Sequence, residues 1–151
     1  MKQSAGILLY KKASDEIFVL LAHPGGPYWK NKDAGAWSIP KGEFTNEENA
    51  LDAAIREFEE EIGTTISGDF IELQPVKLKS GKTIYAYALE QDLDTSTVKS
   101  NEFEIEWPPK SGKTISIPEI DKAEWFPAAE ALEKINVAQG DFIKQLVERI
   151  R

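Results

Sequence analysis

Residues 42–64 read GEFTNEENALDAAIREFEEEIGT, and this stretch is the most informative part of the sequence. It contains eight acidic residues and one basic residue, Arg56, so that it carries a charge of −7. The chain of 151 residues has a formal net charge of −8, which leaves the rest of it nearly neutral. An acidic block is ordinarily the solvated face of a helix, and this interpretation has to be weighed first.

The same stretch predicts one long helix over residues 45–62. Thr45 is a suitable N-cap, Glu48 follows it at the spacing of a capping box, and Gly63 is a typical terminator. Four apolar residues at helical spacing form a stripe that would face the core, namely Leu51, Ile55, Phe58 and Ile62.

The acidic residues of this helix are placed unfavourably for a solvated face. Glu57, Glu60 and Glu61 are spaced i, i+3 and i+4, where each pair of like charges costs about 0.2–0.5 kcal/mol. Glu59, Glu60 and Glu61 also fall in the last turn, at the negative end of the helix dipole, at a further cost of about 0.3–1 kcal/mol each. This order indicates carboxylates that a divalent cation neutralises, and oxygen ligands suit Mg²⁺ or Mn²⁺.

The remaining sequence predicts an α/β domain over residues 1–151. Short apolar runs and turn residues predict strands over residues 5–10, 17–23 and 37–39, hairpins over 71–91 and 101–117, and one or two helices between 128 and 151. In the second hairpin, acidic residues alternate with Phe103, Ile105 and Trp107, as in a strand with one buried face. A long loop rich in Gly, Pro and aromatic residues spans 23–36.

Composition excludes several classes of function. The chain has no Cys and a single His, His23, which excludes disulfides, thiolate nucleophiles and cysteine zinc sites. Its negative charge argues against binding to a nucleic-acid backbone. The apolar runs are too short to span a membrane and no secretory leader is visible, so we expect a cytoplasmic protein.

The spacing of the fixed residues in 42–64 resembles the Nudix box, G-x5-E-x7-R-E-U-x-E-E-x-G-U, in which U is a bulky aliphatic residue. Thr64, at the final U position, is the one departure, and it concerns core packing rather than chemistry. The resemblance implies an α/β (α+β) Nudix fold, with a mixed β-sheet sandwiched between helices and the box forming a loop, a helix and a second loop.

The same resemblance implies roles for the residues of the box. Glu57, Glu60 and Glu61 would be ligands of Mg²⁺ or Mn²⁺, and the carbonyl group of Gly42 would reach a metal. Glu57 is also a candidate base, and Arg56 would orient a box carboxylate. For Glu48, the capping box remains the alternative.

Two further segments resemble particular branches of the family. Lys41, in Pro-Lys-Gly-Glu, is similar to the entry of diadenosine tetraphosphate hydrolases and is a candidate phosphate-binding residue. Glu119 lies six residues before Trp125, as a metal ligand or base does in dinucleoside-polyphosphate and RNA 5′-pyrophosphate branches. Tyr28 and Trp29 are candidates for stacking on a nucleobase, the alternative being aromatic plugs of the loop.

These residues together predict a metal-dependent pyrophosphohydrolase. The expected reaction cleaves a pyrophosphate bond in a nucleoside diphosphate linked to another moiety, in a dinucleoside polyphosphate or nucleoside triphosphate. Water would attack directly, because an activated Ser, Cys or His is not evident. The alternatives are an ADP-ribose or other nucleotide-sugar pyrophosphatase, or a non-catalytic nucleotide-binding Nudix module. A homodimer is left open.

Overall fold

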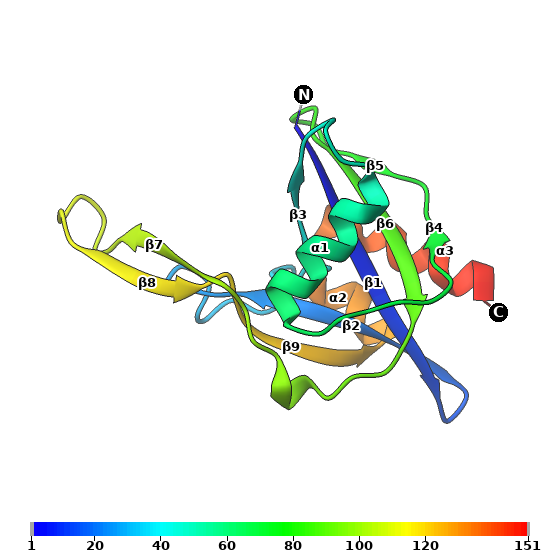
Figure 1. Cartoon of the computed structure of the whole chain (residues 1–151). Coiled ribbons are helices and arrows are strands. Elements are labelled where there is room, and N and C mark those ends of the chain that lie inside the picture. The colour runs from blue at the N-terminus through cyan, green and yellow to red at the C-terminus, as the bar shows by residue number, and fades with distance from the viewer. Residues whose placement is uncertain (1, 151) are drawn as a thin grey trace.

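A mixed seven-stranded sheet lies at the centre of the computed structural model, which describes residues 2–150 (Figure 1). Its strand order is β4-β6-β1-β2-β9, with β3 paired to β1 and β5 paired to β6. The pair β1–β6 is parallel, and the other pairs of this sheet are antiparallel. The strands are β1 (Gln3–Ala13), β2 (Glu16–Pro24), β3 (Lys41–Phe44), β4 (Ile71–Glu72), β5 (Val76–Lys77), β6 (Thr83–Glu90) and β9 (Ile120–Pro127).

Helices cover both faces of this sheet. Successive residues of β1 point to opposite faces, so that Ile7 packs in the core under helix α1 (Ala50–Ile62), while Leu8 packs in the core under the C-terminal helices. The C-terminal elements are α2 (Ala128–Lys134), the 3-10 turn η2 (Val137–Gln139) and α3 (Gly140–Ile150). This architecture confirms the predicted mixed sheet between helices. Within residues 2–150 no helix combines the length and apolar character needed to cross a membrane.

Helix α1 is shorter than the sequence predicts. It begins at Ala50, and its N-cap is Asn49, whose side chain accepts a hydrogen bond of 2.8 Å from the backbone of Asp52. The side chain of the expected cap, Thr45, accepts from the backbone of Glu47, and its carbonyl group accepts from the backbone of Glu48, so that Thr45 forms a turn before the helix. The C-terminal end agrees with the prediction, because Gly63 adopts a left-handed conformation with φ 82° and closes the helix.

The buried face of α1 also differs from the expected stripe. Phe58 and Ile62 are fully buried, but Leu51 and Ile55 are only partly buried. Ala53 and Ala54 take the central positions against the sheet. Small side chains at these positions let the helix approach β1 closely, and that approach moves the buried face away from Leu51 and Ile55.

Strands β7 (Glu102–Glu106) and β8 (Thr114–Pro118) form a separate two-stranded sheet, the β7–β8 arm, which projects from the body of the molecule (Figure 1). This confirms the second predicted hairpin. The face expected to be buried is covered only in part, since Phe103 is exposed and Ile105 half-buried, while Ile117 near the base is buried.

Two other strand predictions need correction. Residues 37–39 form isolated bridges, Ala22 with Ser38 and Trp37 with Ile135, rather than a strand. The first predicted hairpin has an interrupted strand, because β4 and β5 each pair separately with β6. The 3-10 turn η1 (Thr95–Thr97) then leads towards the arm.

Candidate active site

Strand β3 and helix α1 bring the first and the central parts of the box together. The Glu57 carboxylate lies directly against the backbone of Gly42, so closely that a Cβ atom at residue 42 would stand 2.1 Å from the carboxyl carbon of Glu57. A side chain at residue 42 would displace the Glu57 carboxylate from this position. The structure therefore places the Gly42 backbone beside the carboxylate that the sequence selects as a ligand and base.

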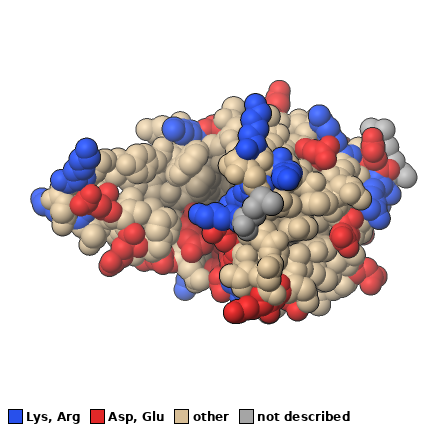
Figure 2. All heavy atoms as spheres, turned by 90° about the horizontal axis from the view of Figure 1, so that it is seen from above, with Lys and Arg blue, Asp and Glu red and all other residues tan. Residues whose placement is uncertain are grey.

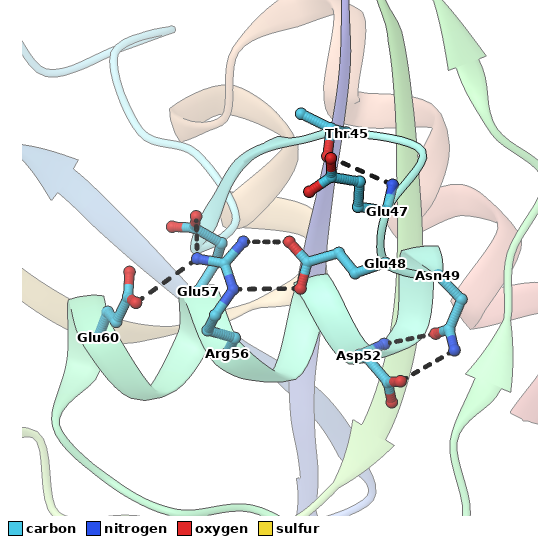
Figure 3. Close-up of polar contacts among 8 residues, drawn as sticks. All are labelled: Thr45, Glu47, Glu48, Asn49, Asp52, Arg56, Glu57 and Glu60. Atoms are coloured by element: carbon cyan, nitrogen blue, oxygen red, sulfur yellow. Dashed lines mark hydrogen bonds and ion pairs between the residues drawn. The ribbon is translucent and has the colours of Figure 1, made fainter.

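Arg56 connects three carboxylates of the box (Figure 3). Its Nη2 and Nε atoms donate to Glu48 at 2.6 and 3.2 Å, and its Nη1 atom donates to Glu57 at 2.9 Å. A longer contact of 3.5 Å reaches Glu60. The capping box predicted for Glu48 is wrong, because its carboxylate binds the guanidinium group of Arg56 and not the start of the helix.

These contacts shift the pKa values of the groups that make them. The hydrogen bond from Arg56 lowers the pKa of Glu48 below its ordinary value. The pKa of Arg56 is raised in return, chiefly by its hydrogen bond with Glu48. Glu48 is therefore a carboxylate that the protein itself neutralises, while Arg56 holds Glu57 by its remaining nitrogen.

Glu61 is in the opposite situation. It is 9% exposed, and burial, followed by the negative charges of Glu119 and Glu57, raises its pKa to about 8. The charge of Lys41 and its backbone amide oppose this shift without cancelling it. Burial likewise raises the pKa of Glu57, although Arg56 opposes the shift. The negative charge at this end of α1 lacks full compensation.

A cavity of about 280 Å³ opens beside these carboxylates, at the base of the β7–β8 arm. Lys41 enters it from the start of β3, Glu61 from the last turn of α1 and Glu119 from the junction of β8 and β9. Burial and the charge of Lys82 lower the pKa of Lys41, whereas the carboxylates around it oppose this shift. Seen from above, acidic and basic side chains lie together next to the hollow between the arm and the body (Figure 2).

The two aromatic candidates of the loop lie in different places. Trp29 lines the cavity. Tyr28 is 59% exposed and packs edge-to-face against Trp107 of the arm, with ring centroids 5.0 Å apart. Of the two residues predicted to stack on a nucleobase, the structure brings only Trp29 to the cavity.

Polar contacts hold the loop over residues 23–36 against the rest of the molecule. Asp33 accepts a hydrogen bond from Trp37 Nε1 at 2.8 Å and pairs with Lys134 of α2. His23 is buried, with Nε2 2.6 Å from the carbonyl oxygen of Lys32 and Nδ1 2.9 Å from Asp121. His23 therefore serves to anchor the loop and does not line the cavity.

One residue of the cavity was not predicted from the sequence. Gln139 is 4% exposed and lines the cavity from η2, and its side-chain oxygen accepts from the backbone of Ile39 at 3.0 Å. Residues 39 and 139 are 100 positions apart in the chain, so neither spacing nor periodicity relates them. A lone glutamine before a helix gives no functional signal in a single sequence.

The donor set at the C-terminal end of α1 fits a hard divalent cation. The available ligands are carboxylate and carbonyl oxygens, and the buried charge of Glu61 is left for a cation to compensate. Within residues 2–150, however, the structure shows no group of three or more His, Cys, Asp or Glu side chains already gathered around one point. Arg56 holds the Glu57 and Glu60 side chains in this state.

The NUDIX domain model matches residues 1–146, and the chain therefore belongs to the NUDIX domain family. This match confirms the family predicted from residues 42–64 and, with it, the enzyme class, a Nudix hydrolase acting on phosphoric anhydrides. No curated protein matches the chain in sequence.

Several solved structures share the fold over nearly the whole chain. An Ap4A hydrolase from C. elegans is 19% identical, with 99% of this chain and 98% of that chain covered and a TM-score of 0.66. The NUDIX domain of NrtR from Shewanella oneidensis, complexed with ADP ribose, is 17% identical, with coverages of 99% and 88% and a TM-score of 0.64. A mutT/nudix family protein from Listeria innocua is 19% identical, with coverages of 99% and 93% and a TM-score of 0.64.

Proposed function

We propose that this chain is a metal-dependent pyrophosphohydrolase that cleaves a pyrophosphate bond in a nucleoside diphosphate linked to another moiety. The proposed substrates are dinucleoside polyphosphates and nucleoside triphosphates. The observation that carries this proposal is the buried Glu61 carboxylate, which meets the negative charges of Glu57 and Glu119 at a cavity that also contains Lys41. A divalent cation would relieve this repulsion and attract a polyanionic substrate.

Glu57, Glu60 and Glu61, with the carbonyl group of Gly42, would hold Mg²⁺ or Mn²⁺. When bound, such an ion polarises a phosphoryl oxygen and lowers the pKa of a water molecule. The closeness of the Gly42 backbone to the Glu57 carboxylate supports this assignment.

The protein's own residues have separate tasks in the proposed reaction. Arg56 orients Glu57 through the bond of 2.9 Å, and either Glu57 or Glu119 accepts the proton of the attacking water at a carboxylate oxygen. Burial favours this role for Glu57, because it raises the pKa of the carboxylate. Water attacks phosphorus directly, since the chain has no Cys and both ring nitrogens of His23 are engaged.

The choice of substrate rests on Lys41 and Trp29. The C. elegans structure is of an Ap4A hydrolase and the Shewanella domain holds ADP ribose, and this chain matches both with similar TM-scores. The fold therefore favours neither ligand. A cation at Lys41 has most to bind when the phosphate chain extends beyond the pair being cleaved, and Trp29 would contact the nucleobase.

Lys41→Met tests this choice. With Mg²⁺ present, we expect kcat/KM on a dinucleoside tetraphosphate to fall about 100-fold and that on ADP-ribose about 10-fold, because the longer substrate places more charge near Lys41. The control is Lys12→Met, which removes the same charge from an exposed position in β1. The substrate assignment is wrong if wild type prefers ADP-ribose or if both rates fall equally. The pyrophosphohydrolase assignment fails if neither compound is cleaved.

A further inference from the structure

The side-chain amide of Gln139 has a fixed orientation. Its Oε1 atom accepts a hydrogen bond of 3.0 Å from the backbone N–H of Ile39 and lies 3.2 Å from Ser38 Oγ. A backbone N–H group can only donate, so the atom facing Ile39 has to be the oxygen. The amide nitrogen, Nε2, therefore points away from Ile39.

This nitrogen is a buried donor without a protein partner. Gln139 is 4% exposed, yet among residues 2–150 its Nε2 atom forms no hydrogen bond, since both bonds of the amide use Oε1. Among the described residues, Ser4 Oγ is the one polar side-chain atom that is fully enclosed and has no hydrogen-bond partner. Because Nε2 also has no partner but does not meet this description, it is not fully enclosed and has access to open space. Since Gln139 lines the cavity, that space is the cavity itself. Water can satisfy this donor while the cavity is open to solvent, and an acceptor on a bound ligand would take the place of that water.

The position of Gln139 relates this acceptor to one part of a substrate. Its partner Ile39 is two residues before Lys41, and both residues line the same cavity as Gln139. Lys41 and Glu61 mark where the phosphates would lie, and Trp29 lines the same cavity. The part of a nucleotide that adjoins its phosphates is the nucleoside half, and the surface of Trp29 suits a planar base.

We propose that Gln139 selects the nucleobase, by donating a hydrogen bond from Nε2 to a carbonyl oxygen on the base. Because Oε1 is already occupied, the amide offers the cavity a donor and no acceptor. It favours a keto base such as guanine, hypoxanthine or uracil. An amino group at the same position of adenine or cytosine would oppose donor to donor. This inference rests on the proposed function, since it assumes that a nucleotide occupies the cavity.

Gln139→Glu tests the proposal with little change of shape. The new side chain retains an oxygen for Ile39 and places a second oxygen where Nε2 was, so that the donor becomes an acceptor. We would measure kcat/KM for GTP and ATP with Mg²⁺, together with the affinity of GDP and ADP by calorimetry. We expect wild type to prefer guanosine about 10-fold or more, and the variant to lose or invert this preference through KM.

Two further variants separate this effect from charge and from folding. Gln74→Glu introduces the same charge at an exposed position outside the cavity and should leave the preference unchanged. Gln139→Met removes the donor without adding charge and should reduce the preference without inverting it. The melting temperature of each variant shows whether it folds.

The ratio between the two bases decides the outcome. If wild type shows no preference for guanosine in either measurement, or if Gln139→Glu weakens GTP and ATP by the same factor, the assignment of Gln139 is overturned. If neither triphosphate is hydrolysed, the proposed function is wrong for these substrates. The calorimetric ratio of GDP to ADP still tests Gln139 in that case.

Discussion

Two carboxylates of the box, Glu48 just before α1 and Glu61 in its last turn, are in opposite electrostatic situations. At the beginning, Glu48 forms two hydrogen bonds with Arg56, which lower its pKa. At the end, Glu61 is buried beside Glu57 and Glu119, and its pKa rises to about 8. The first carboxylate is neutralised by the chain and stabilises the start of the box. The second lacks such a partner, and we propose that this difference separates a structural acid of the box from one that holds a cation.

The largest expected effect comes from replacing the uncompensated carboxylate. We expect Glu61→Gln to lower kcat at least about 1,000-fold with Mg²⁺, and to leave the metal-free protein equally or more stable above pH 8, where the buried carboxyl group of wild type is charged. Turnover assays and thermal melting in a chelator measure the two effects. The matched control is Glu59→Gln. It removes a carboxylate from the same part of the helix, at a position that the box leaves variable and that is not a proposed ligand. A clear loss of metal-free stability in Glu61→Gln would give Glu61 a structural role and remove the contrast between the two ends.

Arg56→Lys tests the neutralised end. Lysine retains the charge, but its single amino group cannot bind both oxygens of Glu48 and one oxygen of Glu57 at the same time. Both carboxylates would therefore lose their fixed orientation. We expect activity to fall about 10- to 100-fold, as for other groups that orient metal ligands. Stability should fall by only about 1 kcal/mol, since Arg56 is partly exposed. Unchanged activity in Arg56→Lys would show that the orientation of Glu57 has no role in turnover.

The pH dependence of stability offers a smaller, independent test of the same contrast. A carboxyl group whose pKa is higher in the folded than in the unfolded protein favours folding below its unfolded value of 4.5 and loses this contribution as the pH rises towards about 8. In a chelator, the wild-type protein should therefore be less stable at pH 8 than at pH 5. We expect Glu61 to contribute about 2 kcal/mol to this difference, less than the full shift would give at about 1.4 kcal/mol per unit, because the side chain can relax towards solvent.

Glu61→Gln provides the control for this measurement. The variant lacks the titrating group, so its unfolding free energy should change less between pH 5 and pH 8 than that of wild type. If the unfolding free energies of the two proteins changed equally with pH, the raised pKa of Glu61 would have no effect on stability.

Local patterns predicted the parts of the site that lie close together in the chain. The end of α1 at Gly63 and the burial of Phe58 and Ile62 follow from turn chemistry and helical periodicity. The predicted start failed because Arg56, eight residues further on, competes for Glu48 with the backbone at the helix N-terminus. A side chain with two possible partners cannot be assigned from spacing alone.

Contacts between segments that are distant in the chain could not be predicted from the sequence. Tyr28 and Trp29 are neighbours in the chain, yet one packs on the β7–β8 arm and the other lines the cavity. Gln139 reaches the cavity only because η2 packs against residues 38 and 39. The carboxylate end of the site could thus be predicted from one motif, whereas the end proposed to recognise the base depends on how the loop, the arm and the C-terminal elements pack.

The most direct test of the central claim is the stabilisation of the folded protein by a divalent cation. A cation that binds the folded carboxylates and not the unfolded chain raises stability by about 2.7 kcal/mol at 100 times its dissociation constant. Melting curves of wild type and Glu61→Gln would be recorded at increasing Mg²⁺ or Mn²⁺ concentrations, with no substrate present. We expect the melting temperature of wild type to rise with concentration and that of Glu61→Gln to rise much less. An equal rise in both proteins, or none in wild type, would contradict the claim that the C-terminal end of α1 is a metal site.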